Sequence, residues 1–145
     1  MPQQDRWAIA HAEEDGMPIL FRYRNQPPVK DTTQFPFLVS ILWIYQGDAN
    51  TGMPGNEVLR EMERFEDALD SIDDSSAGFL MVAVTGNDRR EWIWYTSDTN
   101  RFMALLNAAL KGRPKFPLDL SASEDPAWLT YLTIRESSNR RGTDQ

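Results

Sequence analysis

The single histidine of the chain, His11, is the residue best suited to acid or base chemistry. An imidazole titrates near neutral pH, and a general base works beside an acid that orients it. Glu13 and Glu14 follow closely, so a small hydrolase or transferase centred on His11 is one functional hypothesis. A histidine at a strand end that packs its ring and binds water or a backbone carbonyl explains the same residues, and we assign no catalytic residue from this pattern.

A second group combines arginines with aromatic side chains, a composition that proteins use to hold carboxylates, phosphates or single-stranded bases. The candidate binding residues are Arg22, Arg24, Arg89, Arg90, Trp92, Trp94, Trp128 and Tyr131. Core packing of one tryptophan, with ion pairs between the arginines and the surplus acids, explains the same residues and is the favoured interpretation. The aromatic and glycine signature of RNA-binding ferredoxin-like domains is absent from the sequence, which argues against RNA binding. Binding of single-stranded RNA on an open sheet face is therefore only a second alternative.

Four aspartates crowd the end of the first predicted helix and the segment after it: Asp67, Asp70, Asp73 and Asp74. Carboxylates there oppose the helix dipole at a cost of up to about 1 kcal/mol each, which a hard cation would offset. Their spacing lacks the glycine and the distal glutamate of a calcium loop. The sequence therefore predicts a solvated connection, with no metal and no other cofactor.

Composition limits the classes of protein to which the chain can belong. With 145 residues, 41% of them apolar, and five tryptophans, one domain can bury a core without disulfides or a metal. A formal net charge of −7 repels phosphate backbones, which argues against nucleic acid as a partner. The chain has no cysteine, no secretory signal at its N-terminus and no apolar run near the roughly 20 residues of a membrane span. We therefore expect a cytoplasmic protein without membrane contact.

Hydrophobic periodicity places the elements that must position these side chains. Period-two alternation and short apolar runs predict strands, and apolar residues three and four apart predict helices. Asp15-Gly16 lies between the first two strands and suits a hairpin turn with positive φ. The predicted strands cover residues 6–12, 19–24, 38–45, 79–85, 91–95 and 116–120, and the predicted helices cover about 56–71, 99–110 and 127–135.

From residue 38 onward the order is strand, helix, strand, strand, helix, strand, the split βαβ or ferredoxin-like arrangement of an α+β fold. The N-terminal hairpin is an addition to it, and a short C-terminal helix follows Asp125 as N-cap and Pro126 as first helical residue. We expect one domain over residues 1–136 and a disordered tail over 137–145. The predicted core, between the sheet and two helices, consists of Trp43, Phe65, Leu69, Val82, Trp92 or Trp94, Leu106 and Leu110.

Short motifs recur along the chain in a fixed order and spacing. They are Trp7, Asp15-Gly16, Pro18, Arg22, Arg90-Glu91, Tyr95, Asp98 and the ending Asp125-Pro126-x-Trp128-x-x-Tyr131. Over nearly the whole chain this pattern resembles a bacterial family, domain of unknown function family 695. In that family some relatives carry a second domain similar to the regulator of ribonuclease E activity type B, for which 145 residues leave no room. The resemblance implies a one-domain α+β fold and no particular activity.

The residues together favour a non-catalytic binding or regulatory module that contacts a protein or a small ligand. Interface anchors are enriched in Trp, Tyr and Arg, which suits a protein partner for an acidic domain. The hydrolase or transferase centred on His11 and the single-stranded RNA binder are the alternatives.

Overall fold

The N-terminal hairpin forms where alternation predicts it. The computed structural model describes residues 6–143, and in it β1 (Trp7–Glu14) pairs antiparallel with β2 (Met17–Arg24). Asp15 and Gly16 make the turn with φ of 53° and 80°. Asp and Gly tolerate this left-handed region better than most residues, so the local sequence determines the turn.

A six-stranded antiparallel sheet organises the molecule, in the order β1-β2-β4-β5-β3-β6. The remaining strands are β3 (Phe37–Ile44), β4 (Gly78–Gly86), β5 (Arg89–Thr96) and β6 (Leu118–Glu124). β6 begins directly after Pro117 and lies at one edge of the sheet, where a residue without a backbone donor is tolerated. β3, apolar on both of its faces, lies between β5 and β6.

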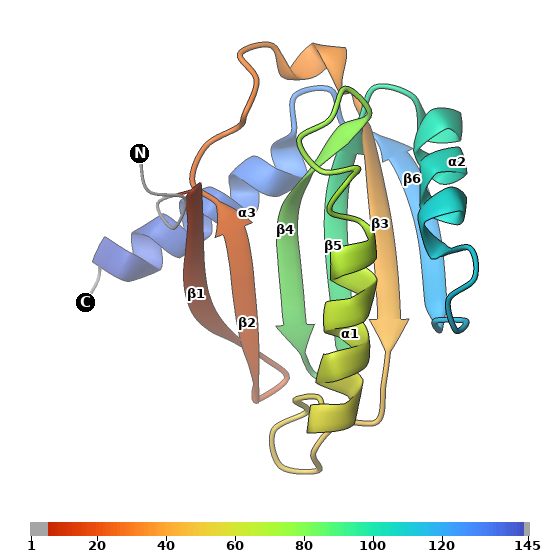
Figure 1. Cartoon of the computed structure of the whole chain (residues 1–145). Coiled ribbons are helices and arrows are strands. Elements are labelled where there is room, and N and C mark those ends of the chain that lie inside the picture. Colours follow the sequence, from red (N-terminus) through yellow and green to blue (C-terminus); the bar gives the residue numbers. More distant parts are fainter. Residues whose placement is uncertain (1–5, 144–145) are drawn as a thin grey trace.

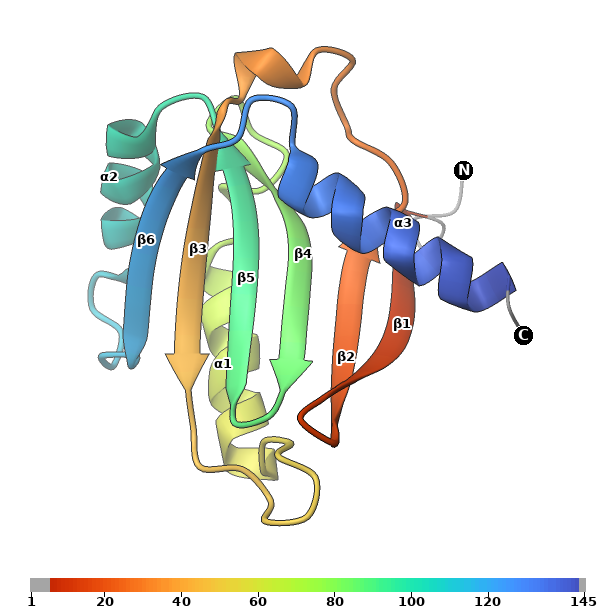
Figure 2. The same ribbon diagram turned by 180° about the vertical axis from the view of Figure 1, so that it is seen from behind.

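Two helices cover one face of the sheet and a third crosses the other, which makes the fold a mixed α/β one. α1 (Asn56–Ala68) and α2 (Thr99–Leu110) lie in front of the sheet in Figure 1. α3 (Leu129–Thr143) runs obliquely across the opposite face, over β4 and the hairpin, as Figure 2 shows. Within residues 6–143, none of the helices has the length and apolar character needed to cross a membrane.

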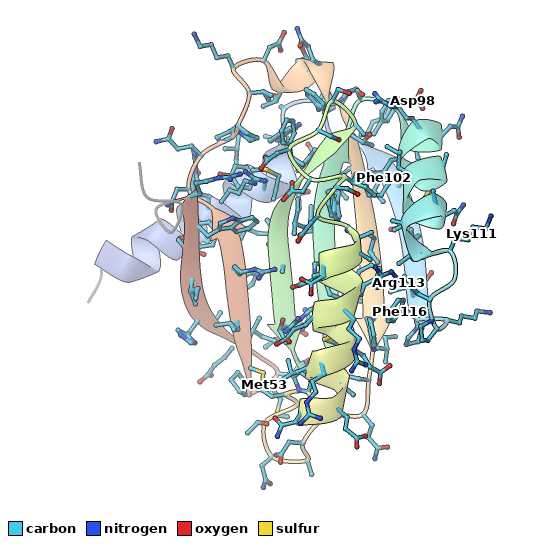
Figure 3. All side chains as sticks on the ribbon, in the orientation of Figure 1. Met53, Asp98, Phe102, Lys111, Arg113 and Phe116 are labelled. Atoms are coloured by element: carbon cyan, nitrogen blue, oxygen red, sulfur yellow. The ribbon has the colours of Figure 1, made fainter. Side chains whose placement is uncertain are left out.

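The apolar stripes of α1 and α2 face the sheet. Met62 and Phe65 on α1 and Phe102 and Leu106 on α2 are buried, and Figure 3 shows Phe102 on the sheet side of its helix. Asp98 caps α2 because its carboxylate accepts a hydrogen bond from the Arg101 N–H at 3.1 Å. Both helices therefore lie where their periodicity predicts, although α1 ends three residues earlier.

The buried residues form two clusters, one on each face of the sheet. Beneath α1 and α2 lie Trp43, Phe65, Leu69, Trp92, Trp94 and Leu106, with Leu110 partly buried against them. Val82 lies instead in the cluster beneath α3, so its predicted position is wrong. A β-bulge between Leu80 and Val82 shifts the alternation of β4, and that shift puts Val82 on the opposite face.

The C-terminal helix starts later and runs further than its pattern predicts. The Trp128 N–H donates to the Asp125 carbonyl at 2.9 Å, so Pro126 lies in a turn and the helix begins at Leu129. The Asp125 carboxylate still caps the helix, because it accepts from the Leu129 and Thr130 N–H groups at 2.8 and 3.1 Å. Although the sequence predicts a disordered tail over residues 137–145, the helix continues to Thr143, and residues 144–145 lie outside the described ones. Ser138 is buried on this stretch, because α3 crosses the hairpin there.

Candidate functional site

A cavity of about 390 Å³ lies between the N-terminal hairpin, α1 and the face of the sheet that α1 covers. We call it the hairpin–helix pocket. Its walls come from the hairpin, from the centre of the sheet and from the last turn of α1 with the residues after it. The lining residues are Trp7, Arg22, Glu66, Asp67, Leu69, Asp70, Asp73, Leu80, Trp92 and Trp94.

Helix geometry brings the acidic side of the pocket together. Glu66 follows Phe65 in the last turn of α1, and Asp70 and Asp73 lie in the turns after Ala68, where the Asp73 N–H still bonds to the Leu69 carbonyl at 3.3 Å, so the three carboxylates stay beside Phe65 and Leu69. The same periodicity that buries one face of α1 therefore directs carboxylates toward the hairpin. The arginines of β2 face them, because Arg22 lies on the same face of the sheet as Trp7.

Glu66 is the most connected side chain of the pocket. Its Oε1 accepts from the Trp92 indole Nε1 at 2.6 Å and from Arg22 Nη2 at 3.1 Å, and Arg90 Nη1 lies 3.6 Å away. Trp92 is fully buried and Arg90 has 14% of its side chain exposed, so both rely on this carboxylate for compensation. Glu66 thereby joins α1, β2 and β5 through one oxygen atom.

Arg24 closes the neighbouring end of the hairpin and is 3% exposed. Its Nε donates to the Leu80 carbonyl at 2.7 Å, and its Nη2 lies 2.9 Å from a carboxylate oxygen of Asp73 and of Asp74. Burial raises the pKa of Asp73, although the Leu80 N–H and Arg24 act in the opposite direction. The guanidinium also lies 5.1 Å from the centroid of the Trp7 ring. These contacts assign Arg24 to holding the hairpin against the α1 exit.

Two carboxylates at the rim of the pocket have no cationic partner among the described side chains. Asp67 and Asp70 are both exposed, and the ion pairs of this region go to Glu66, Asp73 and Asp74 instead. Burial, followed by repulsion from Asp67 and Glu66, raises the pKa of Asp70. The rim thus concentrates negative charge that the fold does not neutralise.

Two donors of the pocket residues have no acceptor in the part of the chain that the structure describes: Trp94 Nε1 and Arg22 Nε. Both atoms are out of contact with solvent, and Trp94 as a whole is 2% exposed. A buried donor without an acceptor costs about 1–3 kcal/mol. The fold satisfies the Trp92 indole and leaves that of Trp94, two residues further along the same strand, unpaired.

The remaining arginine candidates lie apart from the open part of this pocket. Arg89 binds Glu14 Oε2 at 2.9 Å and the Gly86 carbonyl at 2.8 Å, where the two hairpin turns meet. Arg90 donates from Nε to Thr85 Oγ1 at 2.7 Å in addition to its contact with Glu66. Both side chains are therefore engaged in connections between strands.

The candidate acid–base residues His11, Glu13 and Glu14 lie on β1 and are exposed. They border a second cavity, of about 250 Å³, between the hairpin and α3, whose floor is mostly apolar. Glu14 binds Asn87 and Arg89 there, and those contacts lower its pKa. Since side chains alternate along a strand, His11 points away from the face on which Ala10 and Ala12 meet α3.

The aromatic candidates Trp128 and Tyr131 are buried on the opposite face of the sheet. The Trp128 ring stacks on Tyr95 at 4.3 Å and its Nε1 donates to the Phe35 carbonyl at 2.8 Å. Tyr131 Oη donates to the Arg24 carbonyl at 2.6 Å. The candidate arginines and aromatics therefore divide between two faces, and only Arg22, Trp92 and Trp94 line the hairpin–helix pocket.

Trp7 and Glu66 are pocket residues that were not nominated for binding from the sequence, and Asp67 and Asp70 were weighed there only as part of a cation site and assigned to a solvated connection. Alternation along the hairpin gave a signal for Trp7, because it places this ring on one face with Arg22 and Arg24. Glu66 follows Phe65 of the apolar stripe, which puts it at the border of the buried face of α1. Among residues 6–143, no three His, Cys, Asp or Glu side chains form a group that could hold a metal ion.

These observations define a one-sheet α/β protein with an aromatic pocket rimmed by acids. Residues 5–134 match the model of the Family of unknown function (DUF695), and the chain belongs to that family. No curated protein and no solved structure matches the chain.

Proposed function

We propose that this protein is a non-catalytic binding module and that a small ligand occupies the hairpin–helix pocket. The observation that carries the proposal is that Trp94 and Arg22, whose Nε1 and Nε have no acceptor among residues 6–143, both line one cavity. At about 390 Å³ the cavity lies at the lower end of the range for small-molecule sites, roughly 300–1,000 Å³. Such sites combine apolar walls with a few polar groups that orient the ligand, and this pocket has both.

Burial favours a small ligand over a protein partner. Trp92, Trp94, Trp128, Tyr131 and Arg24, which have the composition of interface anchors, are all buried inside the chain. The large apolar side chains with the greatest exposure are Ile9, Ile44 and Leu129, and they lie on three different elements. Scattered apolar residues of this kind are ordinary surface features.

We also propose that the segment from β3 to β6 has the ferredoxin-like arrangement. The strand order β4-β5-β3-β6 and the two helices on one face support it. RNA-binding domains of this type present aromatic side chains on the face without helices. Here Trp92 and Trp94 belong to the cluster beneath α1 and α2, and α3 crosses the opposite face, so the geometry supports RNA binding poorly.

The tryptophans offer a direct test, because three of the five line the pocket and two lie elsewhere. A two-dimensional NMR spectrum of the ¹⁵N-labelled protein separates their indole N–H signals. We expect that titration with a collection of small amines, acids and amides shifts the signals of Trp7, Trp92 and Trp94. The signals of Trp43 and Trp128 should remain in place.

A pair of matched variants locates the binding. Arg22→Met removes the unpaired donor and its charge from the pocket, whereas Arg60→Met removes an exposed arginine from α1. Affinity should fall in the first variant and persist in the second. A collection that shifts none of the three pocket signals, or that shifts all five equally, would refute the proposal.

A further inference from the structure

The charges of the hairpin–helix pocket select among ligands. Glu66 is compensated by Arg22 and Arg90, and Asp73 by Arg24, so the acidic groups left over are Asp67 and Asp70 at the rim. Both attract a cation at the mouth and repel an anion. The formal net charge of −7 acts in the same direction at longer range.

The interior of the pocket requires a different group. Trp94 Nε1 and Arg22 Nε are donors without an acceptor among the described residues, so a ligand that reaches them must offer an oxygen or another acceptor. Arg22 is the one cation among the described residues that line the pocket, against the four carboxylates of Glu66, Asp67, Asp70 and Asp73, and this balance reduces the advantage of an anionic oxygen. A neutral carbonyl or hydroxyl oxygen therefore fits this end. Because 40% of the Arg22 side chain is exposed, it can rotate to admit such a group.

Between the two ends the walls are apolar and aromatic. Leu69 and Leu80 face the pocket together with the rings of Trp7, Trp92 and Trp94. The Arg22 guanidinium already makes a cation–π contact with the Trp7 ring, 5.4 Å from its centroid. The cation of the ligand therefore binds the rim carboxylates and not this ring. A compact hydrocarbon portion suits these walls, beside the charged rim and the buried donors.

We infer that the pocket binds a small organic ammonium ion that carries a neutral oxygen acceptor on a short apolar skeleton. The ammonium group lies at Asp67 and Asp70, and the oxygen accepts from Trp94 Nε1 and Arg22 Nε. This inference rests on the proposed function and specifies its ligand class.

Four probes of closely similar skeleton separate the contributions. L-Leucinamide has the cation and the carbonyl, N-acetyl-L-leucinamide is neutral, N-acetyl-L-leucine is an anion, and 3-methylbutylamine has the cation without the oxygen. Each is titrated at pH 6.5 while the five indole signals are followed. L-Leucinamide should shift the signals of Trp7, Trp92 and Trp94 and should bind about three- to fivefold more tightly than its neutral analogue, the upper part of the range for an exposed ion pair.

Two variants test which protein groups bind the ammonium group and the oxygen of the ligand. The double substitution Asp67→Asn and Asp70→Asn, at exposed positions, should reduce the advantage of L-leucinamide over its neutral analogue to less than twofold. Trp94→Phe keeps the ring and removes the N–H, so it should weaken L-leucinamide about fivefold or more and leave 3-methylbutylamine unchanged. Because Trp94 is buried, the melting temperature of this variant is measured first, and the rim variant tests the inference independently of it.

The outcomes distinguish this inference from the proposal beneath it. If N-acetyl-L-leucine binds as tightly as L-leucinamide and shifts the same three signals, the ligand class is wrong and the pocket remains the binding site. If the double rim variant keeps the full preference for the cation, the inference is also overturned. If no probe shifts the three signals at millimolar concentration, both the ligand class and the proposed function fail.

Discussion

Replacement of Glu66 by alanine tests the central contact of the pocket without a ligand. The substitution removes the acceptor of the buried Trp92 indole, which costs about 1–3 kcal/mol for an unsatisfied donor. It also leaves Arg90 without its carboxylate at 14% exposure, whereas Arg22, 40% exposed, loses an ion pair worth at most about 1 kcal/mol. The higher helix propensity of alanine returns a few tenths of a kcal/mol.

The indole and Arg22 contributions, less the gain in helix propensity, give a loss of about 1–4 kcal/mol in the free energy of unfolding, and the unpaired charge of Arg90 adds to it. For a chain of 145 residues this corresponds to a fall of about 10 °C in the melting temperature. Urea unfolding followed by tryptophan fluorescence measures the free energy, and a thermal melt gives the temperature. Glu66→Gln keeps an oxygen acceptor for the indole, so it should lose only about half as much as Glu66→Ala.

Glu63→Ala is the matched control, because Glu63 is an exposed glutamate on the same helix. Its free energy of unfolding should remain within about 0.5 kcal/mol of the parent value. If Glu66→Ala and Glu63→Ala unfold at the same urea concentration, then Glu66 does not hold the three elements together and the account of the pocket fails.

Three further substitutions examine other parts of the fold. Leu106→Ala should cost about 2–5 kcal/mol in urea unfolding through transfer and cavity effects, whereas the exposed Asn107→Ala should be nearly neutral. Although burial opposes it, hydrogen bonds from Tyr95 Oη and from the α3 N–H groups lower the pKa of Asp125 from its ordinary value of 3.8. The ionised Asp125 carboxyl therefore stabilises the fold fully above about pH 3.8, and this contribution is lost as the pH falls through the lower pKa of the folded state. Asp125→Asn should be less stable than the parent at pH 6, and the two stabilities should converge near pH 2. Asp70→Asn should raise the melting temperature slightly at pH 7, since the raised pKa of Asp70 means that ionisation of this carboxyl opposes folding there; an unchanged or lower value would contradict that sign.

Local patterns predicted the elements on which the pocket is built. Asp15-Gly16 sets the hairpin turn by its own conformational preference, and the stripe through Phe65 and Leu69 sets the buried face of α1. The cap at Asp98 likewise depends on residues within one helical turn. Such features are decided by neighbours in sequence, and for that reason one chain suffices to predict them.

Features that depend on distant contacts were not predictable in the same way. The bulge between Leu80 and Val82 reverses the face of one residue without any local mark in an apolar strand. Trp128 takes a left-handed φ of 55° because its ring must stack on Tyr95, and that contact joins residues far apart in the chain. The length of α3 likewise depends on the hairpin that it crosses.

The candidate site shows the same division. Alternation places Arg22 and Arg24 on one face of β2, but it does not reveal that Asp73 and Asp74 bury Arg24 while Arg22 borders a cavity. Trp92 and Trp94 share a face because they lie two residues apart on one strand, yet only the position of Glu66 on α1 decides that, among the described residues, one indole is paired and the other is not. The sequence therefore predicted that arginine and tryptophan side chains are candidates for binding. Which of them line the pocket depends on how α1 packs against the hairpin.

The hairpin–helix pocket contains interactions that lower the stability of the fold. Elsewhere in the part of the chain that the structure describes, buried side-chain polar groups have partners, as Trp128 Nε1 does at Phe35 and Tyr131 Oη at Arg24. In the pocket the Trp94 indole N–H has no acceptor among residues 6–143, and Asp70 lies near two other carboxylates just beyond the end of α1, where the dipole also opposes it. Costs of this kind that coincide with a cavity are expected where a ligand supplies the missing partner. Stability and affinity should therefore change in opposite directions at Asp70: the asparagine variant that melts higher should bind L-leucinamide less tightly.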